Sequence, residues 1–167
     1  MHPGINLLNV VNADGVVMKY QGILSTQGVT PEERHLPGLV KWVIENKRLV
    51  VYHTSALHSD YTPAEAFMRT GSGILMFMIS HDPEEYIIWF RPEMLRELRW
   101  AGNPAKPVET DPTNLGNISP RHSFKTWIEY VAGRSEDWSI GEIDSVMRLR
   151  EEIMHTLNEK KYLTPGS

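Results

Sequence analysis

The chain has 167 residues, of which 41% are hydrophobic and 23% are charged, and its formal net charge is −4 at pH 7. This length predicts a single domain that buries its own core, and the acidic balance argues against nucleic acid as a partner. The chain has no cysteine, which excludes disulfides, thiolate catalysis and cysteine zinc sites. We identify no signal peptide, and the longest apolar run, residues 73–79, is too short to span a membrane. We therefore expect a cytoplasmic protein without a membrane partner.

The first third of the chain predicts strands on either side of a helix. The apolar segment 5–11 ends at residues 12–15, where Asn, Asp and Gly are typical of a turn. Residues 16–22 predict a strand, and residues 21–28 predict its tight return. Thr30 before Pro31 is typical of a helix N-cap, so residues 30–47 predict a helix, which Pro37 could divide into two pieces. Residues 48–55 predict another strand.

The next segment predicts a short helix and a hairpin. Residues 62–69 begin with the same Thr-Pro pair, and residues 72–80 and 84–91 are apolar strands joined by a turn at 81–84. Strands on both sides of short helices predict the α+β class, with an antiparallel β-sheet flanked by helices.

The organisation changes after residue 91. Residues 92–120 contain five of the eleven prolines, which is typical of a functional or disordered segment. However, four of the five tryptophans lie around or within this segment, at positions 89, 100, 127 and 138. Disordered linkers are poor in aromatic residues, so we expect a segment that docks against a partner surface.

The end of this segment fits two secondary structures. Phe124, Trp127, Ile128 and Val131 follow the spacing of a helix, whereas Trp127, Glu129 and Val131 alternate as in a strand. Short apolar runs are often ambiguous in this way. The alternative is an element with two packings that differ by only a few kcal/mol. Both interpretations remain open at this point.

Residues 139–160 predict a long amphipathic helix. Ser139 and Glu142 form a capping-box pattern, and the apolar residues have 3-4 spacing. The predicted seam consists of Ile140, Ile143, Met147, Met154 and Leu157, with Arg150 interrupting it. The helix could cover the sheet or continue into a parallel helical pairing, and two heptads are too few to decide. Residues 161–167 predict a tail.

The chain offers little for catalysis. His122 and Ser123 are adjacent, but no nucleophile elbow surrounds the serine and no third partner is placed by spacing. No histidine pattern completes a metal site, and Thr70–Ile74 lacks the phosphate-loop signature. We therefore predict no enzyme activity, no catalytic residue and no metal. Arg121 could offer a fork of donors for a partner's carboxylate, and the alternative at this point is a solvated surface arginine.

One motif connects these features to a known family. The residues Pro120, Arg121, His122, Ser123 and Phe124 form a P-R-x-S-F motif. Together with "WFRPE" at 89–93, "WAGNP" at 100–104 and the segments at 6–22 and 138–151, it resembles the PHY domain of bacterial phytochromes. The likeness covers roughly residues 5–157. It implies a single PHY domain over 1–167, with a GAF-like fold, a tongue at about 91–123 and an output helix at about 139–160.

The resemblance implies a signal-relay domain of a red/far-red bilin photoreceptor. In this family the tongue seals the chromophore pocket of a neighbouring GAF domain and refolds between strand and helix. The residues expected to contact that pocket are Pro120, Arg121, Ser123 and Phe124. The expected switch residues are Trp100, Gly102 and Trp138, and the expected tongue base consists of Trp89, Arg91 and Glu93. Ala101 departs from the family's usual middle glycine.

The resemblance also implies partners. No cofactor is expected on this chain itself, and a bilin of the biliverdin type is expected in the adjacent GAF domain. That GAF domain is the expected partner in cis, together with a C-terminal output domain such as a histidine kinase. A homodimer through the C-terminal helix is a further expectation. The alternative function is a GAF-type sensory module that holds a small ligand in its own sheet pocket.

Overall fold

The structure is a computed structural model that describes residues 6–95 and 120–163, with the side chains of 120–122 and 160–163 excepted. Its centre is a five-stranded antiparallel sheet in the order β2-β1-β5-β4-β3. The strands are β1 (Gly15–Tyr20), β2 (Ile23–Gly28), β3 (Val51–Thr54), β4 (Gly73–His81) and β5 (Glu84–Arg91). The predicted α+β class, with helices flanking an antiparallel sheet, is confirmed.

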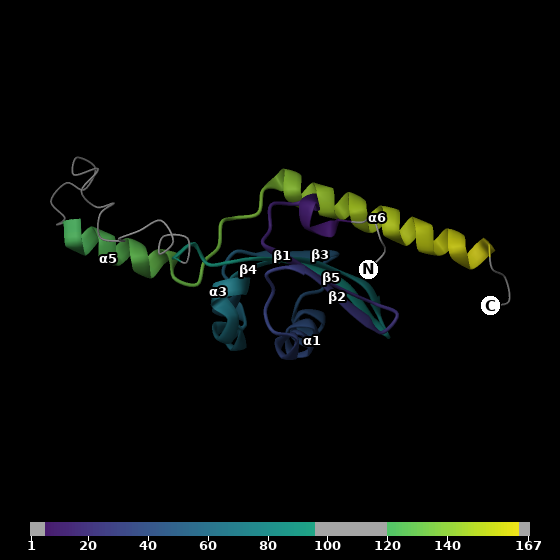
Figure 1. Cartoon of the computed structure of the whole chain (residues 1–167), viewed down its shortest axis with the longest axis horizontal. Coiled ribbons are helices and arrows are strands. Elements are labelled where there is room, and N and C mark those ends of the chain that lie inside the picture. The colour runs from purple at the N-terminus through teal and green to yellow at the C-terminus, as the bar shows by residue number, and fades with distance from the viewer. Residues whose placement is uncertain (1–5, 96–119, 164–167) are drawn as a thin grey trace.

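Helices cover both faces of the sheet (Figure 1). On one face lie η1 (Leu7–Val10) and α6 (Ile140–Leu163), and on the other lie α1 (Leu36–Asn46) and α3 (Met68–Gly71). Three short elements, η2 (Glu33–His35), α2 (Leu57–Asp60) and η3 (Thr62–Phe67), complete the connections. Helix α5 (Pro120–Val131) extends away from the sheet at one end of the molecule, and the far end of α6 lies at the other.

Strands β4 and β5 are buried on both faces over most of their length, which explains their almost unbroken apolar sequence. Ile74 and Met76 of β4 point into the core under α1, and their neighbours Leu75 and Phe77 point into the core under α6. The fully buried ring of Trp89 on β5 belongs to the second core, and its Nε1–H donates to the Leu7 carbonyl at 2.9 Å. The sheet is therefore the middle of three layers.

The predicted helix at 30–47 begins later than its sequence suggests. The 3-10 turn η2 follows Glu32 as its N-cap, and α1 begins at Leu36, so the predicted Thr30 cap is wrong. Pro37 lies in the first turn of α1 and does not divide it. A proline fits there because the first helical N–H groups have no partner within the helix.

Helix α6 confirms the capping box but not the whole predicted seam. The Glu142 N–H donates to Ser139 Oγ at 3.1 Å, and the Ser139 N–H donates to Glu142 Oε1 at 2.9 Å. Ile140 is 87% exposed and Met147 is 40% exposed, so these two residues face away from the core. The stripe that packs on the sheet consists instead of Ile143, Val146, Leu149, Ile153, Met154 and Leu157. A straight helix repeats every 3.6 residues, so its buried face departs from the heptad template. The helix covers the sheet.

No helix in residues 6–95 and 120–163 combines the length and the apolar character needed to cross a membrane.

Candidate functional site

The predicted P-R-x-S-F motif forms the first turn of α5. Pro120 occupies the first helical position, where proline is favoured. Phe124 is half-buried and its ring lies 6.0 Å from that of Trp127, while the buried Ser123 hydroxyl has no hydrogen-bond partner among the described residues. The helix continues to Val131, beyond the predicted tongue end at 123. The side chains of Pro120 and Arg121, and all of Trp100 and Gly102, lie outside the described residues.

The chain leaves the sheet and returns to it at one place, where residues 91–94 meet residues 133–138. We call these two segments the junction. The Met94 N–H donates to the Arg134 carbonyl at 2.7 Å, and the Gly133 N–H donates to the carboxylate of Glu93 at 3.1 Å. Glu93 is only 6% exposed, so this bond satisfies part of a buried carboxylate. The predicted base residues Arg91 and Glu93 therefore hold the outgoing and returning segments together.

Two glycines allow the returning segment to approach the body closely. Gly133 follows α5 with φ +70°, a conformation that side chains rarely adopt, and a Cβ there would lie 2.3 Å from the His58 ring. A Cβ on Gly73 would lie 2.0 Å from Ser135 Oγ. The Ser135 N–H donates to the Ser55 carbonyl at 2.8 Å. The junction is thus packed against the sheet with no room for an added methyl group.

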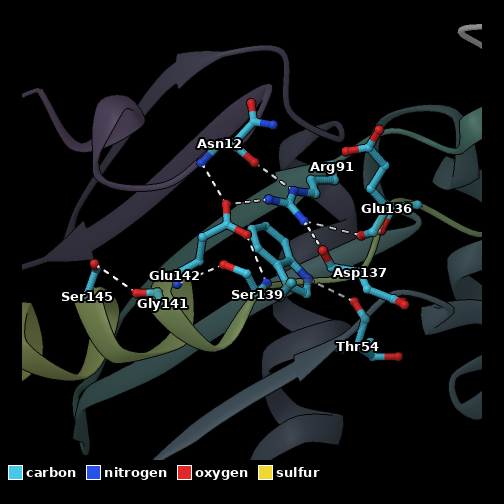
Figure 2. Close-up of polar contacts among 11 residues, drawn as sticks. Asn12, Thr54, Arg91, Glu136, Asp137, Ser139, Gly141, Glu142 and Ser145 are labelled. Atoms are coloured by element: carbon cyan, nitrogen blue, oxygen red, sulfur yellow. Dashed lines mark hydrogen bonds and ion pairs between the residues drawn. The ribbon is translucent and has the colours of Figure 1, made fainter.

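Arg91, the last residue of β5, is the centre of the junction (Figure 2). Its side chain is 7% exposed, and its Nε–H donates to the Asn12 carbonyl at 2.6 Å. Its Nη1 donates to the Asp137 carbonyl at 2.7 Å and to the Glu136 carbonyl at 3.3 Å. Its Nη2 contacts Glu142 Oε2 at 2.5 Å. One guanidinium therefore joins the loop before β1, the returning segment and the first turn of α6.

Glu142 receives donors from three directions. Besides Arg91, the Asn12 N–H donates to its Oε2 at 3.0 Å, and the Ser139 N–H donates to its Oε1 at 2.9 Å. Burial raises the pKa of Glu142, but the hydrogen bonds from Ser139, Arg91 and Asn12 and the guanidinium charge outweigh it. The net effect lowers the pKa below its ordinary value of 4.5. The carboxylate is held in its charged form at the start of the helix.

Trp138 lies against the same guanidinium. The Arg91 carbon Cζ is 3.8 Å from the centroid of the Trp138 ring, which is a cation–π contact. Trp138 is 7% exposed, and its Nε1–H donates to the Thr54 carbonyl at 3.1 Å. Its role as a switch residue stays a prediction, and any such movement must break these contacts. Trp127 on α5 is 40% exposed and carries no comparable restraint among the described residues.

Sequence reasoning missed the Arg91–Glu142 pair. The capping-box pattern identified Glu142 as a partner of Ser139, and the resemblance identified Arg91 as a base residue. Arg91 and Glu142 are 51 residues apart in the sequence, so no spacing pattern connects them. The sequence signal that was available is a strand ending in arginine together with a helix-capping glutamate. Among the described residues, no group of three or more His, Asp or Glu side chains is placed to hold a metal ion.

Comparison with known proteins assigns the family. The family model described as "Phytochrome region" (PHY) matches residues 1–162. Cyanobacterial phytochrome B of Nostoc is 34% identical over 155 residues, which cover 93% of this chain and 21% of that protein. Cyanobacterial phytochrome A of Nostoc is 33% identical over 152 residues, covering 90% and 20%. Phytochrome C of Sorghum bicolor is 30% identical over 157 residues, covering 93% and 14%. The chain therefore spans about a fifth of the length of its cyanobacterial relatives, and the resemblance drawn from its motif is confirmed: the chain belongs to the PHY family.

Proposed function

We propose that this PHY domain, a single domain over 1–167, is a non-catalytic relay in a cytoplasmic red/far-red photoreceptor. Its tongue seals the chromophore pocket of a neighbouring GAF domain, refolds between strand and helix when light is absorbed, and passes the change to an output domain. The observation that carries the proposal is the guanidinium of Arg91, which bonds both the returning segment and the first turn of α6. The junction is therefore a physical connection between an extension of the chain and the exit helix.

The size of the expected movement follows from helix and strand geometry. The twelve residues of α5 span about 18 Å as a helix and about 40 Å as a strand. Refolding changes the reach of the segment by roughly 20 Å. The Ser135 N–H is bonded to the Ser55 carbonyl, and Arg91 binds the next two carbonyls, those of Glu136 and Asp137. A pull that breaks the Ser135 bond therefore displaces the carbonyls that Arg91 binds. Ser139, the N-cap of α6, is only two residues after Asp137, so the displacement also reaches the start of α6.

The tongue motif supplies the contact with the pigment pocket in this proposal. Arg121 pairs with a GAF aspartate in the red-absorbing state, and Ser123 takes over that aspartate in the far-red-absorbing state. The Ser123 hydroxyl, without a partner among the described residues, supports the second contact. The bilin, of the biliverdin type, is bound by the GAF domain in cis and not by this chain.

The exit helix supplies the output contact. Ile140 and Met147 leave two apolar side chains of α6 exposed, which supports pairing of this helix with a second copy. We propose that such a homodimer transmits the signal to a C-terminal output domain such as a histidine kinase.

The test uses this domain joined to its preceding bilin-binding domain and loaded with biliverdin. Arg121→Ala should bind the pigment but lose or bleach the photoproduct in absorbance spectra, while Lys125→Ala, an exposed charge on the same helix, should photocycle like the wild type. Arg91→Met should form the photoproduct yet reduce the light-dependent difference in output. Equal photocycles for Arg121→Ala and wild type would refute the pocket seal, and unchanged output in Arg91→Met would refute the relay through the junction.

A further inference from the structure

The sheet has an open corner beside β3. Strand β3 pairs with β4 only from Val51 opposite Phe77 to Thr54 opposite Ile74, while β4 continues to His81. Leu49 and Val50 precede β3 and are 65% and 55% exposed. A cavity of about 450 Å³ occupies this corner, between the end of α1 and α6. Its volume is within the range of small-molecule sites.

The cavity combines an apolar wall with positive charge. Val43 and Ile44 of α1 and Met76 and Met78 of β4 supply apolar surface. The titratable and charged side chains in its lining are Lys47, Arg48, Tyr52, His81 and Arg150, and no carboxylate lines it within the described residues. The three cations among them come from two places: Lys47 and Arg48 from the connection after α1, and Arg150 from α6. The chain as a whole is acidic, with net charge −4, so their convergence is not a consequence of composition.

Two of the cations, Lys47 and Arg150, form no ion pair with a carboxylate in the part of the chain that the structure describes. Lys47 Nζ lies 5.6 Å from the ring centroid of Trp42 and 5.7 Å from that of Tyr52, which restrains the ammonium. Arg150 Nε is buried and has no hydrogen-bond partner among the described residues. By contrast, Arg148 on the exposed face of the same helix pairs with Asp144 at 2.8 Å. A buried guanidinium N–H normally has an acceptor, and the Arg150 side chain lines an open cavity.

We propose that the corner binds a small amphipathic anion, a carboxylate or phosphate carried on an apolar body. The anionic group binds the guanidinium of Arg150 and the charges of Lys47 and Arg48, and the apolar body lies on Met76 and Met78. A second cavity of about 530 Å³ between β1, β2 and α6 is mainly apolar, and its charged lining residue is Glu152. That cavity suits a neutral ligand, so charge distinguishes the two. The proposal is independent of the relay function.

The experiment measures binding of decanoate, decanol and inorganic sulfate to this chain by isothermal titration calorimetry. Decanoate should bind at least roughly tenfold more tightly than either probe, because only decanoate combines a charge-assisted hydrogen bond with apolar contact. Arg150→Met should weaken decanoate binding roughly tenfold and leave decanol unchanged. Arg148→Met removes the same charge from the other face of α6 and should change decanoate binding by less than about twofold.

The outcomes separate the proposal from general attraction to apolar surface or charge. Decanol binding as tightly as decanoate would overturn it, as would equal effects of Arg150→Met and Arg148→Met. If sulfate bound as tightly as decanoate, apolar contact would contribute nothing to the affinity, and the proposal would also be overturned. Lys47→Met on the opposite layer is the second variant, and it should weaken decanoate binding in the same direction even if Arg150→Met alters the packing of α6.

Discussion

Replacing Arg91 with methionine tests the junction most directly. Methionine keeps an unbranched apolar side chain to lie on Trp138, but it removes the guanidinium that bonds the carbonyls of Asn12 and Asp137 and the carboxylate of Glu142. The carboxylate of Glu142 then remains partly buried without a counterion, since its side chain is only 19% exposed.

The expected cost is about 3 kcal/mol of unfolding free energy. Removing one partner of a buried ion pair costs about 3–5 kcal/mol, because the other charge is left uncompensated. The lower end applies here, because Glu142 retains the N–H groups of Asn12 and Ser139. Glu142→Gln preserves the capping pattern, but its amide NH₂ faces a backbone N–H that the carboxylate accepted from. This change should lower the free energy of unfolding by about 1–2 kcal/mol. Arg148→Met breaks an exposed pair, with side chains 77% and 53% exposed, and should cost less than about 1 kcal/mol.

Urea unfolding of the three variants gives the comparison, with equal m-values showing that the same surface is exposed. Amide hydrogen exchange adds a local readout, because the Ile143 N–H, which donates to the Ser139 carbonyl at 3.0 Å, should lose protection in Arg91→Met before the strands do. A cost for Arg91→Met no larger than that for Arg148→Met would show that the guanidinium is not a structural connection, and the reasoning for the junction would fail.

Four further outcomes are expected. Gly73→Ala should lower the free energy of unfolding in urea by about 1–3 kcal/mol, because its Cβ would lie 2.0 Å from Ser135 Oγ. Adding Ser135→Gly should recover part of that loss, and no recovery would contradict the contact. Burial, together with the charges of nearby glutamates, raises the pKa of Tyr86 to about 12. Its contribution to stability should therefore be complete below pH 10 and lost as the pH rises through 12. Tyrosinate absorbance, measured beside urea unfolding over this pH range, should show ionisation and loss of stability together. The pKa of Glu142 is lowered, so its contribution should be complete above pH 4.5 and lost as the pH falls through the folded value; Glu142→Gln should flatten this acid slope. The double variant Arg91→Met with Glu142→Leu should be more stable than Arg91→Met alone, and under the proposed relay it should still reduce the light-dependent output.

Local signals in the sequence predicted much of the fold. The capping box at Ser139 is a contact between residues three apart, and the hairpin of β4 and β5 is a contact between neighbours, so both could be predicted from pattern. The start of α1 could not, because the Thr-Pro pair at 30–31 precedes a 3-10 turn that begins at Glu33, and the α-helix begins only at Leu36. The face of α6 was predicted only in part, since Ile140 and Met147 fit a heptad but the sheet lies on the other side.

The candidate sites depend on contacts that sequence spacing cannot show. Arg91 and Glu142 meet across 51 residues, and the fit of Gly73 against Ser135 exists only after the sheet and the returning segment are assembled. Arg150 looked like an interruption in an apolar seam. In the folded chain it points toward the cavity beside β3, where its polarity is the informative feature.

The chemistry of the junction supports the proposed relay more than a purely stabilising role. A buried ion pair is weak evidence of stabilisation, because apolar residues of similar volume often do as well. Apolar packing is non-directional, whereas the guanidinium of Arg91 has donors in a fixed plane and uses them on three separate segments at once. A displacement of the returning segment therefore cannot leave α6 where it was without breaking a bond to a buried charge. If the junction were held by apolar contacts alone, the returning segment could slide without moving α6. The position of α6 would then not depend on the conformation of α5.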